Sequence, residues 1–224
     1  MTAVRCVVFD VDDTLYLERD YVYSGFSVVG RWAAVKFGID DFFERAWRLF
    51  ECGVRRTIFD EVLAAAQLTA DQQLLDEMVT MYRRHRPSIA LLDDSRRVLD
   101  ALHGVIALAA VTDGPLESQT AKIAALGLDR WLDPIICTAA RGASFTKPSR
   151  LAFEEIEEAT GCRGDGCMYV ADNPHKDFAG PKDLGWRTVR VRRPASLHCE
   201  QPSGTDVDVE VSDLDGLVCL VGVR

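Results

Sequence analysis

Long hydrophobic runs are missing from this sequence of 224 residues. No stretch approaches the roughly 20 consecutive apolar residues that a membrane-spanning helix needs. Residues 1–9 enter a short strand pattern directly, without the basic and apolar segments of a secretory signal. Internal repeats and low-complexity tracts are also absent. We therefore expect a cytoplasmic protein that has no membrane partner.

Basic residues are outnumbered, with 26 Lys and Arg against 35 Asp and Glu, which gives a net charge of -9. A nucleic-acid-binding surface needs a basic patch, so this balance argues against nucleic acid as a partner. An acidic protein still binds phosphates where local cations or a bridging metal ion offset the charge. The hydrophobic content of 48% is ordinary for a globular protein with a sizeable core.

The seven cysteines are an odd number and are scattered along the chain. In a reducing compartment such cysteines are mostly small core residues. Cys162 and Cys167 flank a glycine-rich turn, but no second pair of ligands lies at zinc-finger spacing. The sequence therefore gives little support to a zinc site.

Short apolar segments alternate with helical patterns over most of the chain. Continuous apolar runs predict buried strands at 4–9, 105–111, 135–137, 168–171 and 188–191, and the alternating residues 207–211 predict an edge strand. Helices are expected at 94–103, from Pro115 to Gly127, at 149–160 and at 177–184, and Ser212 with Asp215 resembles a capping box for a last helix. Such alternation predicts an α/β fold with a doubly wound parallel sheet.

Residues 20–85 follow a different pattern, because their apolar positions have helical spacing and no strand interrupts them. Of the 19 aromatic residues in the chain, 11 lie between Tyr16 and Phe59, which is enough to form a separate core. We predict an all-helical insert at 17–87, with the Rossmann-like core formed by 1–16 and 88–224.

Polar residues follow the predicted strands at the points where ligands bind in open parallel sheets, the carboxyl ends of the strands. The first strand ends in Asp10-Val11-Asp12-Asp13-Thr14. Thr112-Asp113-Gly114 follows the second core strand, and Asp172-Asn173-Pro174-His175-Lys176-Asp177 follows a later one. Lys147 lies in a loop before a helix.

In this order and placement, these clusters resemble the four motifs of the haloacid dehalogenase superfamily of phosphohydrolases. The first motif of that family is DxDx(T/V) after a hydrophobic strand, here Asp10 to Thr14. Thr112, Lys147 and the acidic pair Asp172 and Asp177 match the second, third and fourth motifs. The resemblance covers nearly the whole chain except about the last 30 residues, and the helical insert matches the position and character of the family's C1 cap.

The resemblance implies a Mg²⁺ cofactor, since hard oxygen ligands suit that ion and clustered carboxylates need a cation. Asp10 and Asp172 would bind the metal through their carboxylates and Asp12 through its backbone carbonyl. Asp177 would hold the water ligands of the metal. Asn173 is expected to shape this acidic loop.

The resemblance also implies catalytic roles. Asp10 would be the nucleophile that forms an aspartyl-phosphate. Asp12 would act as general acid and then as general base. Thr112, the backbone N–H groups of Asp113 and Gly114, and Lys147 would bind the substrate phosphate, and Lys147 would also offset charge in the transition state.

Plainer interpretations compete with these roles at each position. The aspartates of the first motif also suit a capped turn, and Thr112 to Pro115 suits an ordinary strand-to-helix turn. We interpret Asp13 as a capping or supporting residue and His175 as a solvent-facing loop residue, although a metal ligand is an alternative for His175. Three tyrosines after the first motif are candidates for contact with substrate, namely Tyr16, Tyr21 and Tyr23.

We therefore predict a Mg²⁺-dependent phosphatase whose partner is a small phosphorylated metabolite, either a sugar phosphate or a nucleoside monophosphate. Asp12 favours hydrolysis of a phosphate ester over dehalogenation, because the dehalogenases of this superfamily lack an acidic residue there. A phosphomutase of the β-phosphoglucomutase type and a catalytically silent binding module are the alternatives. We expect a monomer or a homodimer.

Overall fold

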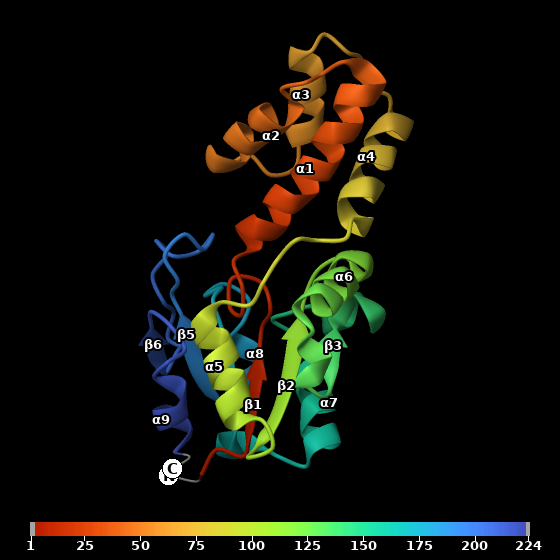
Figure 1. Ribbon diagram of the computed structural model, residues 1–224. Coiled ribbons are helices and arrows are strands. Elements are labelled where there is room, and N and C mark those ends of the chain that lie inside the picture. The colour runs from red at the N-terminus through yellow and green to blue at the C-terminus, as the bar shows by residue number, and fades with distance from the viewer. Residues whose placement is uncertain (1–2, 223–224) are drawn as a thin grey trace. The chain divides into compact units, whose positions relative to one another are not determined.

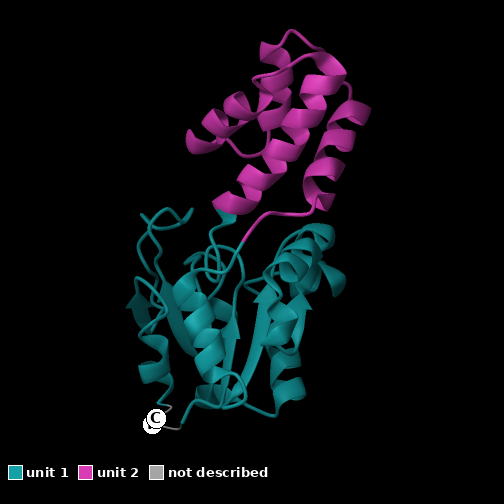
Figure 2. Cartoon of the chain, viewed as in Figure 1, with its two compact units in different colours: residues 1–18, 90–224 teal, residues 19–89 magenta. Residues whose placement is uncertain are grey.

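The computed structural model describes residues 3–222. The chain forms two compact units (Figure 2). One contains the chain up to Glu18 and from Ala90 onward, and the other contains Arg19–Ile89. The predicted helical insert at 17–87 shares residues 19–87 with the second unit.

The first unit is built on a six-stranded sheet of order β3-β2-β1-β4-β5-β6, in which every neighbouring pair is parallel. The strands are β1 (Cys6–Phe9), β2 (Ala107–Thr112), β3 (Ile135–Cys137), β4 (Cys167–Ala171), β5 (Arg187–Val191) and β6 (Val209–Val211). Because β1 lies between β2 and β4, the residues that follow these three strands emerge side by side at one edge (Figure 1).

Helices cover both faces of this sheet. They are α5 (Asp93–Leu102), α6 (Leu116–Leu126), α7 (Leu151–Thr160), α8 (Ala179–Asp183) and α9 (Leu217–Val221), with the 3₁₀ helices η1 (Leu128–Arg130), η2 (Thr138–Ala140), η3 (Ala143–Phe145) and η4 (Gly164–Gly166). Val8 of β1 and Tyr169 of β4 pack in one buried cluster with Phe153 of α7. On the opposite face, α5 runs in front of β1 and contacts α9 (Figure 1).

The continuous apolar character of the strands is explained by this two-sided coverage. All four residues of β1 are completely buried, so both faces of the strand need apolar side chains. The predicted α/β fold with a doubly wound parallel sheet is therefore confirmed, and 207–211 does contain an edge strand, β6.

The second unit consists of α1 (Glu18–Phe37, whose first residue belongs to the first unit), α2 (Phe42–Glu51), α3 (Ile58–Ala65) and α4 (Gln72–Arg84). Its core is aromatic: the ring of Phe26 on α1 contacts those of Phe50, Phe59 and Tyr82, with centroids 5.8–6.3 Å apart. Aromatic residues of the segment 21–59, together with Tyr82, thus supply a core within this unit, whereas Tyr16 belongs to the first unit.

The predicted start of the last helix is wrong. The N-cap of α9 is Gly216, and the helix begins at Leu217. The Ser212 hydroxyl instead donates to the Asp213 carboxylate (3.2 Å), which also accepts from the backbone N–H of Asp215 (3.1 Å). These hydrogen bonds form a local turn around Asp213, and they engage the Ser212 hydroxyl that a capping box would use.

Two expectations from composition can be compared with the structure. Within residues 3–222, no helix combines the length and apolar character needed to cross a membrane. All seven cysteines carry free thiols, but the prediction that most of them are core residues is wrong. Cys6, Cys162 and Cys167 are buried, whereas Cys137 and Cys199 are half-buried and Cys52 and Cys219 are exposed.

Candidate active site

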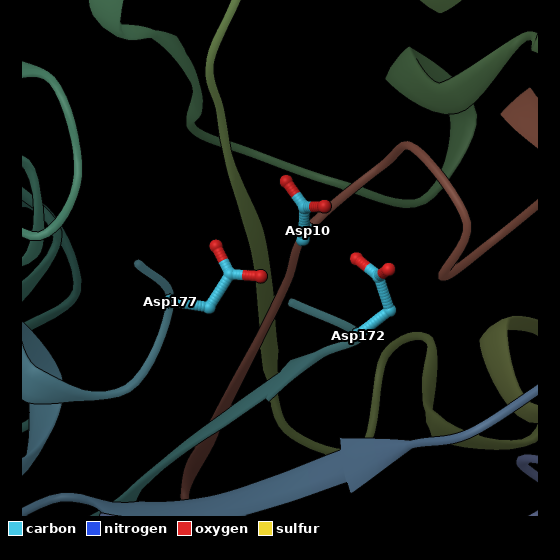
Figure 3. Close-up of side chains that lie close together, drawn as sticks. All are labelled: Asp10, Asp172 and Asp177. Carbon is cyan, nitrogen blue, oxygen red and sulfur yellow. The ribbon is translucent and has the colours of Figure 1, made fainter. Parts of the chain in front are cut away.

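Strands β1 and β4 bring two aspartates to the same edge of the sheet. Asp10 follows β1, and its backbone N–H donates to the carbonyl of Val170 (2.9 Å), while Asp172 follows β4. Asp177 approaches from the loop after β4. Carboxylate oxygens of Asp10, Asp172 and Asp177 lie within 4.8 Å of one another, and all three residues are buried (Figure 3). We call these three residues the acidic group.

Lys147 lies against the acidic group. Nζ of Lys147 is 2.7 Å from Oδ1 of Asp10 and 2.7 Å from Oδ1 of Asp177, and all three side chains are almost fully buried. The contact with Asp177 is a buried ion pair. Nζ also donates to the hydroxyl of Tyr169 (3.0 Å). The acidic group therefore has a direct basic partner on one side.

Three carboxylates and one ammonium group leave an excess of negative charge. Burial, followed by the charges of Asp177 and Asp10, raises the pKa of Asp172 to about 9. Burial raises the pKa of Asp10 to about 6, although Lys147 opposes the rise. Burial alone would lower the pKa of Lys147, but Asp10 and Asp177 hold it well above its usual value. The acidic group thus favours binding of a proton or a cation.

The donor set fits a magnesium ion. Oδ2 of Asp172 is buried and has no hydrogen-bond partner, which is an unfavourable state for a carboxylate oxygen. Mg²⁺ prefers oxygen ligands and is usually bound by one or two carboxylates, with water and substrate phosphate completing its shell. Asp10 and Asp172 meet this requirement from two adjacent strands. Within residues 3–222, no other cluster of at least three His, Cys, Asp or Glu side chains is close enough to hold a metal ion.

The carboxylate of Asp12 lies outside the acidic group and has partners of its own. Its Oδ1 accepts from Nζ of Lys122 (2.6 Å) and from the hydroxyl of Tyr16, and its Oδ2 accepts from Nε2 of Gln119 (2.9 Å). Burial would raise the pKa of Asp12, but Lys122, Tyr16 and Gln119 together lower it below its usual value. Asp10 and Asp12 therefore have opposite electrostatic environments although they are two residues apart.

The end of β2 and the loop after it carry the other predicted phosphate-binding residues. The Thr112 hydroxyl is buried and donates to Oε1 of Gln119 (3.1 Å). Oδ1 of Asp113 accepts from the Thr138 hydroxyl (2.6 Å) and from the backbone N–H of Lys147 (3.3 Å), which ties the loop to the segment that carries the lysine. Gly114 has a φ of +132°, a conformation that favours glycine.

Comparison with known proteins places this arrangement in a family. The family model for haloacid dehalogenase-like hydrolases matches residues 4–185. The chain belongs to this family. It is 25% identical to a glyceraldehyde 3-phosphate phosphatase of Methanocaldococcus jannaschii, with 97% of each chain covered. It is 26% identical to the protein of the same name from Methanothermobacter thermautotrophicus, covering 96% of this chain and 98% of that protein.

Solved structures of haloacid dehalogenase-like proteins share the fold. The HAD-hydrolase YfnB from Bacillus subtilis superimposes with a TM-score of 0.71 at 20% identity, covering 99% of this chain and all of that one. The L-2-haloacid dehalogenase from Xanthobacter autotrophicus superimposes with a TM-score of 0.64, also at 20% identity, covering 99% of both chains. Both phosphatase and dehalogenase names thus occur among the similar proteins, so the site must indicate which chemistry applies.

Hydrogen bonds to the backbone occupy the side chains of Asn173, Asp177 and Asp13. The backbone N–H of Asn173 donates to Oδ2 of Asp177 (2.9 Å), and the side-chain oxygen of Asn173 accepts from the backbone N–H of His175 (3.0 Å). His175 is exposed and is not part of the acidic group. Asp13 is buried, and its carboxylate accepts from the backbone N–H groups of Glu18 and Leu197 (both 2.8 Å). Asn173 and Asp13 therefore shape loops.

The three candidate tyrosines have different environments. Tyr16 is fully buried and donates to Asp12. Tyr21 belongs to the second unit, where its hydroxyl donates to the carbonyl of Tyr82 (3.3 Å). Tyr23 is 51% exposed, and its ring packs against Phe43 with centroids 4.8 Å apart. Tyr16 therefore contacts a predicted site residue, Asp12.

Sequence reasoning missed several residues that contact the predicted site, among them Gln119, Lys122, Tyr169 and Arg190. Nε of Arg190, which is completely buried, donates to the backbone carbonyl of Asp172 (2.9 Å). Gln119 and Lys122 lie one turn apart in α6, and that spacing, with two polar residues on one helix face, is the signal that could have identified them. Nothing in the local sequence marks Tyr169, which resembles any other residue of a buried strand.

Proposed function

We propose that this protein is a Mg²⁺-dependent phosphatase that hydrolyses a small organic phosphate through an aspartyl-phosphate. The observation that carries the proposal is the buried acidic group with Lys147, together with a second carboxylate, Asp12, two residues after the nucleophile. The full-length similarity to two proteins named glyceraldehyde 3-phosphate phosphatase supports a sugar phosphate as the first substrate to test. Nucleoside monophosphates are the second class.

The acidic group would hold the metal ion. Asp10 and Asp172 would bind it through carboxylate oxygens, the backbone carbonyl of Asp12 would add a third protein ligand, and Asp177 would bind its water ligands. When bound, Mg²⁺ neutralises charge on the acidic group and on the substrate phosphate. Arg190 would keep Asp172 in place through the backbone carbonyl of that residue.

Two displacements at phosphorus account for the reaction. An oxygen of Asp10 forms a bond to phosphorus while the bond from phosphorus to the substrate's alkoxy oxygen breaks. Asp12, whose partners favour its ionised form, must first take up a proton from the phosphate ester or from solvent, and it gives this proton to the leaving oxygen. A water molecule then attacks phosphorus and gives a proton to Asp12, while the bond to Asp10 breaks and inorganic phosphate leaves. Lys147 and the loop of Thr112, Asp113 and Gly114 would bind the phosphate oxygens throughout.

Asp12 is the reason to prefer phosphate ester hydrolysis over dehalogenation. A phosphate ester of an alcohol needs a proton on its leaving oxygen, whereas a halide ion leaves without one. The partners of Asp12 hold it beside the nucleophile's strand in a buried setting. We further propose that the helical unit serves as a cap that excludes water and selects the leaving group, which favours small substrates, and that the protein acts as a monomer or a homodimer.

The test is phosphate release from a panel that contains glyceraldehyde 3-phosphate, other sugar phosphates, nucleoside monophosphates and p-nitrophenyl phosphate, with Mg²⁺ or EDTA. We expect release that requires Mg²⁺, is abolished in Asp10→Asn, and falls by about 10²–10⁴-fold in Asp12→Asn. Asp183→Asn, at an exposed position of α8, is the matched control and should behave as the wild type.

The same panel distinguishes the alternatives. Formation of an isomeric sugar phosphate without phosphate release would replace the phosphatase by a mutase. Absence of any turnover from a folded protein that has bound Mg²⁺ would favour a binding module. Chloride release from a 2-haloacid that depends on Asp10 would contradict the role proposed for Asp12.

A further inference from the structure

Helix α6 directs two buried polar side chains at the carboxylate of Asp12. Gln119 and Lys122 are 2% and 3% exposed, and they donate to different oxygens of that carboxylate. Residues three apart lie on the same helix face, so both donors come from one rigid element. A lysine this deeply buried is rare unless it is paired, and here it forms an ion pair with Asp12 at 2.6 Å.

The side-chain amide of Gln119 links Asp12 to the loop after β2. Its Oε1 accepts from the Thr112 hydroxyl (3.1 Å), while its Nε2 donates both to Asp12 and to the backbone carbonyl of Asp113 (2.8 Å). Because Asp12 and the Asp113 carbonyl both offer acceptor atoms, the end of the Gln119 side chain that faces them is its NH₂ group. Gly114 makes room for this group, because a Cβ atom there would lie 2.7 Å from Nε2.

Three donors leave part of the carboxylate available. An ionised carboxylate has about four acceptor positions. Lys122 and Tyr16 both donate to Oδ1, whereas Gln119 is the one donor to Oδ2 among the hydrogen bonds of the described residues. The remaining position is therefore on Oδ2, the oxygen whose direction Gln119 determines.

We propose that Gln119 and Lys122 are positioning residues that hold the carboxylate of Asp12 so that Oδ2 faces the leaving oxygen of the substrate. The inference rests on the proposed phosphatase function and extends it. Proton transfer requires correct placement within hydrogen-bond distance, and a displacement of 1 Å can lower a rate by about 10²-fold. Through Asp12, the pair would thus act on the proton-transfer part of the reaction.

A structural role for the pair makes a different prediction. If Gln119 and Lys122 only satisfied buried polar groups, their loss would lower stability and affect all substrates alike. A positioning role depends on the leaving group. An alkyl phosphate needs protonation of its leaving oxygen, while p-nitrophenolate is a stable anion that needs much less help.

The experiment compares kcat and KM for glyceraldehyde 3-phosphate and p-nitrophenyl phosphate in the wild type, Lys122→Met and Gln119→Met. Methionine keeps the approximate length of each side chain and removes the donor. We expect kcat for the alkyl phosphate to fall by about 10²-fold, kcat for the aryl phosphate to fall only a few-fold, and KM for both to change little. Val98→Ala, a buried position of α5, controls for lost stability and should not change the ratio of the two kcat values.

Each outcome is informative. Equal losses of kcat for the two substrates, or a rise in KM with kcat unchanged, would overturn the positioning role. Should Lys122→Met fail to fold, Gln119→Met decides the same question through the ratio of the two kcat values, because the loss of its bonds to Thr112 and Asp113 would affect both substrates alike. If the wild type releases phosphate from no member of the panel, the proposed function itself fails, and that result is separate from any result with the variants.

Discussion

Nζ of Lys147 lies 2.7 Å from Oδ1 of Asp10, in a pair whose side chains are 0% and 6% exposed. The lysine comes from a loop 137 residues further along the chain, so the contact joins the end of β1 to the segment before α7. The same Nζ lies 2.7 Å from Asp177. One ammonium group therefore balances part of the charge of the predicted nucleophile and of the carboxylate proposed to support the metal ion.

Replacement of Lys147 by Met should lower both stability and activity. Removing one partner of a buried ion pair leaves an uncompensated charge and typically lowers the free energy of unfolding by about 3–5 kcal/mol. Chemical denaturation in EDTA measures this loss, and phosphate release with Mg²⁺ measures the activity. Lys36→Met is the matched control, because the ion pair of Lys36 with Glu77 is also short (2.8 Å) but exposed, and should contribute at most about 1 kcal/mol. Comparable losses in the two variants would contradict this interpretation.

The strand-end residues of the site could be predicted from the sequence, because parallel strands bring their carboxyl ends to one edge. Asp10 and Asp172 follow strands that are readable as apolar runs, and the sheet order places those strands next to each other. The side-chain direction of Asp12 could not be predicted in this way. It depends on Lys122, and a lysine in a helix is usually exposed, so its burial shows only in the folded structure.

The failed capping box at Ser212 has a related cause. The spacing from Ser212 to Asp215 fits the motif, but the intervening Asp213 offers a carboxylate to both ends of the turn. Local hydrogen bonds of this kind compete with helix caps, and the sequence pattern does not show which of them forms. The roles of Asp10, Asp12 and Thr112 in catalysis stay predictions that activity measurements must test.

Metal-free protein should lose stability as the pH rises. The pKa of Asp172 is about 9 in the folded protein, compared with about 3.9 for an unperturbed aspartate. Between these values the folded state retains a proton that the unfolded chain has released, so the free energy of unfolding falls with rising pH by up to about 1.4 kcal/mol per pH unit. The effect of this group is absent below pH ~4 and complete above pH ~9. Denaturation in EDTA between pH 5 and 9 measures the slope.

The Asp172→Asn variant shows whether this residue causes the slope. Asparagine carries no charge, so the metal-free variant should have a shallower pH dependence and be more stable than the wild type near pH 8. Asp183→Asn should keep the wild-type slope, because residue 183 is exposed. An unchanged slope in Asp172→Asn would mean that other groups determine how the free energy of unfolding depends on pH.

Magnesium should reverse the loss of stability at high pH. A ligand that binds only the folded state raises its stability in proportion to the logarithm of ligand concentration over Kd. Because the ion competes with the proton on Asp172, the rise in Tm on adding Mg²⁺ should be larger at pH 8 than at pH 6. Thermal unfolding with Mg²⁺ or EDTA at the two pH values gives the comparison. A similar rise in Tm for Asp172→Asn at pH 8 would argue for a metal site elsewhere.

Two glycines with positive φ allow the effect of backbone strain on kcat to be compared with the effect of a close contact in the site. Gly127 ends α6 with a φ of +62°, and a Cβ atom there would meet nothing within 4 Å. Gly127→Ala should therefore lower the free energy of unfolding by about 1 kcal/mol and leave kcat unchanged. Gly114 has a φ of +132°, and its Cβ would lie 2.7 Å from Nε2 of Gln119.

Gly114→Ala should lower kcat as well as stability, because the methyl group would displace the amide of Gln119 from Asp12 and Thr112. Steady-state kinetics and unfolding curves of both variants compare a substitution that adds only left-handed helical strain with one that adds a stronger backbone strain and a close contact. We expect the loss of kcat in Gly114→Ala to be larger for glyceraldehyde 3-phosphate than for p-nitrophenyl phosphate, as for Gln119→Met. Equal kcat values for Gly114→Ala and Gly127→Ala would show that the loop tolerates the displacement and that the amide of Gln119 is not required in its observed place.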